Sequence, residues 1–126
     1  MNTEKFSLLK RLKSFTYALN GLRIGLIEEH NIRIHFVAML LAIILGLFLN
    51  ISTIEWVGII LSIGLVISLE LLNSALENLA DFGSKEFNEL IKKSKDLAAA
   101  SVFWSALMAL IIGGLIFIPK LVILLE

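Results

Sequence analysis

Three long apolar segments, separated by short polar stretches, dominate the chain. They comprise residues 34–51, 56–82 and 97–118, and a helix needs about 20 apolar residues to cross a bilayer. Ahead of them, residues 5–28 place apolar side chains at alternating spacings of four and three: Leu8, Leu12, Phe15, Leu19, Leu22 and Leu26. Such spacing predicts an amphipathic helix, here with basic residues off the stripe, lying in the membrane interface. The expected fold is all-α and integral to the membrane, a single domain (1–126) with one interfacial and three transmembrane helices.

Composition supports a membrane protein and removes several functional classes. The mean hydropathy is +0.91, with 58% hydrophobic residues, well above the profile of a soluble domain. No cysteine is present, which excludes disulfides, thiolate metal sites and cysteine nucleophiles. Eleven basic residues balance eleven acidic ones, so net charge gives no indication of nucleic-acid binding.

The distribution of basic residues predicts the orientation in the membrane. Six Lys and Arg residues precede the first apolar segment, four lie in the 83–95 connection, and only Lys120 follows the third segment. By the positive-inside rule, the N-terminus and the 83–95 loop are cytoplasmic and the C-terminus lies outside.

Four polar side chains interrupt the second apolar segment: Glu70, Asn73, Glu77 and Asp81. At about 100° per residue they fall within roughly 80° of one another, so they form one face of a helix, here called the acidic stripe. A carboxylate at membrane depth costs on the order of 2.5–3.5 kcal/mol. Three on one face indicate a bound partner, with a cation as the first candidate. Lysines of a partner helix, or a path for ions, are the alternatives.

Further polar groups are expected near the cytoplasmic end of this stripe. Glu29 closes the amphipathic segment, while Lys95 and Asp96 open the third apolar one. Carboxylates suit Mg²⁺, whose coordination is usually completed by substrate phosphates, and a lysine can neutralise phosphate charge. Glu70, which lies deeper, suits a general base acting on a lipid hydroxyl. The pattern favours phosphoryl transfer at a membrane surface. A small oligomeric cation transporter and a non-enzymatic assembly subunit remain alternatives.

The remaining polar and small residues of the apolar segments receive structural interpretations. His30 and His35 are five positions apart, a spacing that does not suit a helical metal pair, and we interpret both as interfacial. In the third segment, small residues recur every four positions at Ser101, Ser105, Ala109 and Gly113, a small-residue stripe typical of helix packing. Three spans enclose little polar volume, so self-association is expected to cover the acidic stripe.

Two runs of residues resemble the prokaryotic diacylglycerol kinase family, which includes undecaprenol kinases. The first is Glu70-Leu71-Leu72-Asn73-Ser74-Ala75-Leu76-Glu77 followed by Asp81, and the second is Lys95-Asp96-Leu97-Ala98-Ala99-Ala100-Ser101-Val102. Tyr17, Gly21-Leu22-Arg23, Glu29, Asn31 and Arg33 extend the resemblance towards the N-terminus. It implies a multi-pass kinase of the bacterial inner membrane, a homotrimer with active sites shared between protomers. It would phosphorylate a membrane lipid alcohol with ATP and Mg²⁺, with diacylglycerol favoured and undecaprenol as the alternative.

The resemblance also implies roles for individual residues. Glu70 would be the catalytic base, Glu29 and Glu77 would hold Mg²⁺, and Asn73 and Asp81 would support the site. The implied ATP-binding residues are Lys10, Tyr17, Glu29, Glu77, Glu86, Phe87, Asn88, Lys95 and Asp96. The implied lipid-binding residues are Ser14, Arg23, Asn31, Glu70 and Ala99.

Overall fold

The computed structural model describes residues 6–83 and 85–126, and these residues form four α-helices. The helices are α1 (Leu8–Glu28), α2 (His30–Phe48), α3 (Thr53–Gly83) and α4 (Glu89–Leu125). Within the described ranges, α2, α3 and α4 are long and apolar enough to cross a membrane. The predicted all-α fold with three candidate spans is therefore confirmed. The predicted start of the amphipathic segment at Lys5, and Ser84 of the 83–95 connection, lie outside the described residues.

Polar side chains define where three of the helices begin. The Ser7 hydroxyl accepts a hydrogen bond from the backbone N–H of Lys10, and Asn88 Oδ1 accepts from the N–H groups of Leu90 and Ile91. At α3, Ser52 and Glu55 form a reciprocal pair: Ser52 N–H donates to Glu55 Oε2 at 2.7 Å, and Glu55 N–H donates to Ser52 Oγ at 3.3 Å. Such caps satisfy the N–H groups that the first helical turn leaves without partners.

The helices differ from the predicted apolar segments at their ends. Helix α2 runs from His30 to Phe48 rather than over 34–51, and α3 begins at Thr53 rather than at residue 56. Helix α4 covers Glu89–Leu125, well beyond 97–118, and Pro119 lies inside it rather than after it. Proline removes one helical hydrogen bond, but membrane helices tolerate this where neighbouring groups compensate. A proline therefore does not mark the end of this helix.

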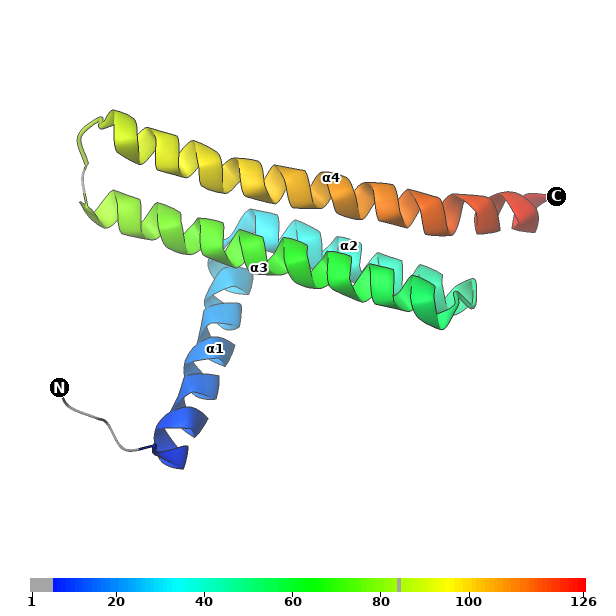
Figure 1. Ribbon diagram of the computed structural model, residues 1–126, viewed down its shortest axis with the longest axis horizontal. Helices are drawn as coiled ribbons and strands as arrows, with labels where there is room; N and C mark the ends of the chain where they lie inside the picture. Colours follow the sequence, from blue (N-terminus) through cyan, green and yellow to red (C-terminus); the bar gives the residue numbers. More distant parts are fainter. Residues whose placement is uncertain (1–5, 84) are drawn as a thin grey trace.

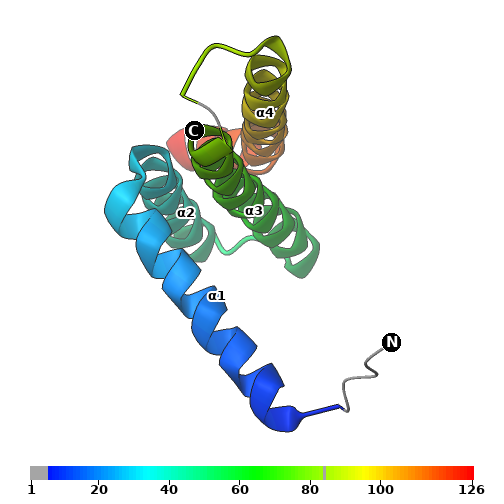
Figure 2. The same cartoon turned by 90° about the vertical axis from the view of Figure 1, so that its left-hand side faces the viewer.

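The three long helices lie side by side, and α1 leaves them at a steep angle (Figure 1). Helix α3 occupies the middle position, between α2 and α4, and it packs most extensively against α4 (Figure 2). A small buried cluster of Ile51, Ile59 and Phe117 packs the end of the bundle where α2 connects to α3. There, Lys120 Nζ also lies 3.3 Å from Glu55 Oε2. The start of α4 and the end of α3 lie at the opposite end, and the junction of α1 and α2 lies beside the middle of α3 (Figure 1).

Gly25 permits the close approach of α1 to the bundle. Its position is buried, and a Cβ atom placed there would lie 2.8 Å from Ile32 Cδ1 and 3.0 Å from Leu71 Cδ2. Leu71 follows Glu70 directly, so this glycine determines how closely α1 packs beside the acidic stripe. One turn earlier on the same helix, a Cβ atom at Gly21 would have no neighbour within 4 Å.

We expect Gly25→Ala and Gly21→Ala to change stability in opposite directions. Both substitutions gain about 1 kcal/mol of helix propensity, but only Gly25→Ala forces side chains apart, which costs about 1–3 kcal/mol in a packed site. The free energy of unfolding in mixed micelles should therefore be lower for Gly25→Ala than for Gly21→Ala. Equal values for the two variants would show that α1 does not pack at Gly25 as described.

Candidate active site

Glu70 is a buried carboxylate that is held by a histidine from another helix. Its side chain on α3 is only 3% exposed, and Oε1 lies 3.0 Å from Nε2 of His35 on α2. A buried carboxylate is costly unless hydrogen bonds compensate its lost hydration. The His35 contact provides this compensation and fixes the orientation of the carboxyl group.

His35 was predicted to be interfacial, and its contact with Glu70 was not foreseen from the sequence. It partners Glu70 across 35 positions of the chain, whereas His30 is exposed and bonds Arg33 Nη2 through Nδ1 at 2.8 Å. The two histidines point to different neighbours because five residues turn a helix by about 140°. The available signal was that His35 is an ionisable side chain inside an apolar segment, which indicates a functional position.

Asn73 contributes a buried oxygen to the acidic stripe. Among the described residues, its Oδ1 atom is buried and has no hydrogen-bond partner. Leaving such an oxygen unsatisfied costs about 1–3 kcal/mol. The atom belongs to a side chain one turn from Glu70 and one turn from Glu77. The stripe therefore offers an oxygen ligand ready to accept a hydrogen bond or to contact a cation.

Two lysines at the start of α4 pair with acidic residues. Lys95 Nζ lies 2.6 Å from Asp81 Oδ1, which ties α4 to the end of the acidic stripe on α3. Lys92 Nζ lies 2.6 Å from Asp96 Oδ2, one turn further along its own helix. The structure thus pairs Lys95 with α3, whereas Lys92 pairs with Asp96 on its own helix. Lys92 was not among the predicted site residues.

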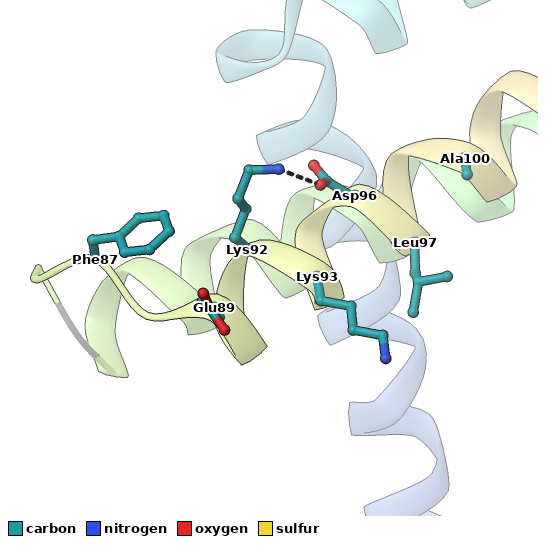
Figure 3. A pocket seen from close by; sticks show the side chains of 7 residues that line it. All are labelled: Phe87, Glu89, Lys92, Lys93, Asp96, Leu97 and Ala100. Atoms are coloured by element: carbon teal, nitrogen blue, oxygen red, sulfur yellow. Dashed lines mark hydrogen bonds and ion pairs between the residues drawn. The ribbon is translucent and has the colours of Figure 1, made fainter.

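An open pocket of about 570 Å³ lies beside the Lys92–Asp96 pair (Figure 3). Its lining brings together two predicted ATP-binding residues, Phe87 and Asp96. The other lining residues were not predicted: Glu89, Lys92, Lys93, Leu97 and Ala100. Lys92, Asp96 and the Phe87 ring lie on one side of α4, whereas Lys93 and Leu97 point to the other. The lining holds two amines, two carboxylates and an aromatic ring, and the amine of Lys92 is already paired with Asp96.

The predicted metal ligands lie on different elements. Glu29 is half-buried and is the single non-helical residue between α1 and α2, while Glu77 is exposed on α3. Among the described residues, no group of three or more His, Cys, Asp and Glu side chains forms a metal site. The available ligands still fit Mg²⁺, because it needs only one or two carboxylates when phosphates complete its coordination. The unsatisfied Asn73 oxygen on the same stripe agrees with that fit.

The predicted residues of α1 do not line the pocket. Lys10, Ser14, Tyr17 and Arg23 are exposed along this helix, and the Ser14 hydroxyl donates to the Lys10 carbonyl at 3.1 Å. Asn31 and Ala99 are exposed on α2 and α4. The described chain alone therefore does not gather these residues around Glu70.

An apolar groove of about 700 Å³ runs between α2 and α4 over α3. Its lining extends over His35–Ala42 of α2, Ile59–Ile67 of α3 and Phe103–Ile118 of α4, and His35 is its ionisable residue. Ala109 and Gly113 of the small-residue stripe line this groove, while Ser105 is buried, its hydroxyl donating to Val102 O at 2.8 Å. We call this the α2–α4 groove.

Three candidate spans, a buried carboxylate and a pocket lined by charged side chains at the start of α4 define a small multi-pass membrane protein with a polar site. The comparison with known proteins specifies the class: residues 16–117 match the family described as prokaryotic diacylglycerol kinase. The chain belongs to this family of lipid kinases, which confirms the resemblance seen in its sequence and identifies it as an enzyme.

Relatives of the chain carry two functional names. It is 41% identical to an undecaprenol kinase of Bacillus subtilis, over 86% of this chain and 89% of that protein. It is 36% identical to a diacylglycerol kinase of Escherichia coli K12, over 87% of this chain and 88% of the relative. A diacylglycerol kinase of Helicobacter pylori is 37% identical, over 76% and 80% of the two chains.

Proposed function

We propose that this protein transfers the γ-phosphoryl group of MgATP to the hydroxyl of a membrane lipid alcohol. The observation that carries the proposal is Glu70, a buried carboxylate held by His35 beside the apolar α2–α4 groove. A transporter needs a continuous polar path. The α2–α4 groove beside Glu70 is instead lined almost entirely by apolar side chains, which suit a lipid better than an ion.

In the proposed mechanism, Glu70 acts as the general base. It accepts the proton of the lipid hydroxyl while the hydroxyl oxygen attacks the γ-phosphorus, and the bond from that phosphorus to the β,γ-bridging oxygen breaks. The products are a phosphorylated lipid, ADP and a protonated Glu70, which returns its proton to water. Lys92 and Lys95 lie where they can reduce the negative charge of the phosphates, and Asn73 can accept a hydrogen bond from an incoming group. The main contributions are positioning and charge stabilisation.

We assign Glu29 and Glu77 as the residues that hold Mg²⁺ together with ATP phosphates. When bound, Mg²⁺ neutralises phosphate charge and orients the γ-phosphoryl group. Phe87 and Asp96 of the pocket are the proposed nucleotide contacts of the described chain, with Glu86 and Asn88 beside them in sequence. The residues Lys10, Ser14, Tyr17, Arg23, Asn31 and Ala99 keep their proposed binding roles in an assembly of more than one chain.

The proposed assembly is a homotrimer with active sites shared between protomers. The exposed predicted site residues on α1 support it, because a neighbouring protomer could supply them to Glu70. In the same proposal α1 lies in the cytoplasmic interface, which suits a helix whose only buried residue is Gly25. In this proposal the N-terminus and the 83–95 connection are cytoplasmic, since ATP must reach the pocket at the start of α4.

Two lipid acceptors are proposed. Diacylglycerol is the acceptor favoured from the sequence, and it agrees with the relatives named diacylglycerol kinase. Undecaprenol is the second, and the 41% identical relative supports it. Both lipids present a primary hydroxyl above apolar tails, and an apolar groove discriminates between tails by only about 1–3 kcal/mol per distinguishing group.

The proposal is tested by radiolabelled phosphate transfer from ATP in mixed micelles, with diacylglycerol and undecaprenol offered in parallel. We expect transfer that requires Mg²⁺, and the faster acceptor names the substrate. Folded protein that transfers phosphate to neither lipid, yet conducts cations across vesicles without ATP, would replace the kinase by the transporter.

A further inference from the structure

The contact between His35 and Glu70 fixes α2 against α3 at the depth of the proposed chemistry. The two side chains are 24% and 3% exposed, and their atoms are 3.0 Å apart. Water has little access to Glu70, so its orientation depends on the hydrogen bonds that the protein supplies. A general base must present one oxygen to the proton that it accepts, within about 2.6–3.2 Å. The residue that holds the carboxyl group therefore affects the reaction even without touching the reactants.

The His35–Glu70 contact lies at one end of the α2–α4 groove. His35 is the first lining residue on α2, and Ile67 is the last on α3, with Glu70 three residues further on. Both residues thus meet at the polar end of an otherwise apolar groove. A lipid hydroxyl that reaches Glu70 from this groove passes beside the imidazole ring, so the ring also closes one side of the carboxyl group.

We propose that His35 is a positioning residue for Glu70, an inference that rests on the proposed kinase function. With the proton on Nε2, the imidazole donates to Glu70 Oε1 and leaves Oε2 to take the proton of the lipid hydroxyl. The other neutral tautomer would direct the lone pair of Nε2 at Oε1 and repel it. His35 neither accepts the transferred proton nor contacts the nucleotide in this arrangement.

The test compares two unbranched side chains of nearly equal length at position 35. His35→Met removes the hydrogen-bond donor, whereas His35→Gln keeps an N–H group that can reach the carboxylate. We expect His35→Met to lower kcat about 10- to 100-fold, the usual effect of losing a group that orients a catalytic residue. The KM for ATP should stay within about twofold, and His35→Gln should recover kcat to within roughly fivefold of the wild-type value.

His30→Met is the matched control, because it makes the same replacement on the same helix. His30 is exposed and bonds Arg33 rather than Glu70, so kcat should not change. Thermal unfolding in the same micelles shows whether each variant is folded, and His35→Leu repeats the loss of the donor if His35→Met is not. A purely structural role for His35 would lower stability without separating Met from Gln in kcat.

The outcomes distinguish a failure of the positioning role of His35 from a failure of the proposed kinase function. An active wild-type enzyme whose folded His35→Met variant keeps the wild-type kcat overturns the positioning role alone. The same conclusion follows if folded His35→Gln is as slow as His35→Met. A wild-type enzyme that phosphorylates neither lipid overturns the kinase proposal, and the role of His35 falls with it.

Discussion

Replacing Glu70 with glutamine is expected to lower phosphate transfer by about 10²- to 10⁴-fold, the range that general acid–base catalysis contributes. Glutamine keeps the volume of the side chain, and its amide oxygen can still accept the hydrogen bond from His35. It cannot take a proton from a lipid hydroxyl. The loss should therefore appear in kcat, measured by radiolabelled transfer in mixed micelles, while MgATP still protects the variant against thermal unfolding.

Glu55→Gln is the matched control for this prediction. Glu55 lies in the first turn of the same helix, 15 residues before Glu70, where it pairs with Ser52 and Lys120. Its replacement should leave the transfer rate unchanged, although the capping pair of α3 is weakened. Near-native turnover in Glu70→Gln would show that the carboxylate is not the base, and that the hydroxyl loses its proton to another group.

Removing a proposed Mg²⁺ ligand should give the second large effect. For Glu29→Gln we expect the Mg²⁺ concentration at half-maximal rate to rise about tenfold or more, because a neutral amide is a poorer ligand for a hard cation than a carboxylate. The same titration with Glu77→Gln should show a similar shift. The stabilisation by MgATP, which follows RT ln(1 + [L]/Kd) for a ligand that binds only the folded state, should fall in both variants.

Glu28→Gln tests whether such a shift is specific. Glu28 precedes Glu29 directly but is exposed in the last turn of α1 and has no assigned role. Its replacement changes the net charge by the same amount at nearly the same place. If Glu28→Gln and Glu29→Gln shift the Mg²⁺ titration equally, the effect is a general change of surface charge, and the assignment of Glu29 is wrong.

The sequence predicted those features that depend on local periodicity. The helices follow from apolar runs and from spacings of three and four, and the acidic stripe follows from positions 70, 73, 77 and 81 on one helix. Glu70 is buried between the helices. These predictions hold because helical geometry alone relates residues that are a few positions apart.

The features that were missed depend on how the helices pack. The partner of Glu70 is 35 residues away, so no spacing rule relates His35 to it. Lys92 was not predicted, because the family-like run begins at Lys95, whose amine is held by Asp81, whereas Lys92 pairs with the predicted Asp96. Pro119 directly follows the predicted span 97–118, yet α4 continues through it to Leu125. The mutual placement of Glu29 and Glu77 likewise depends on contacts between elements.

The one-residue junction between α1 and α2 couples the position of Glu29 to the tilt of α1. This residue is extended, with φ −105° and ψ 114°, between a helix that ends at Glu28 and one that begins at His30. Any change in the tilt of α1 must be absorbed largely by its backbone, so the tilt also moves its carboxylate. Linkage is reciprocal: if Glu29 engages MgATP, nucleotide binding favours one tilt, and lipids that favour that tilt tighten nucleotide binding. The headgroups around α1 would then act as effectors of the enzyme.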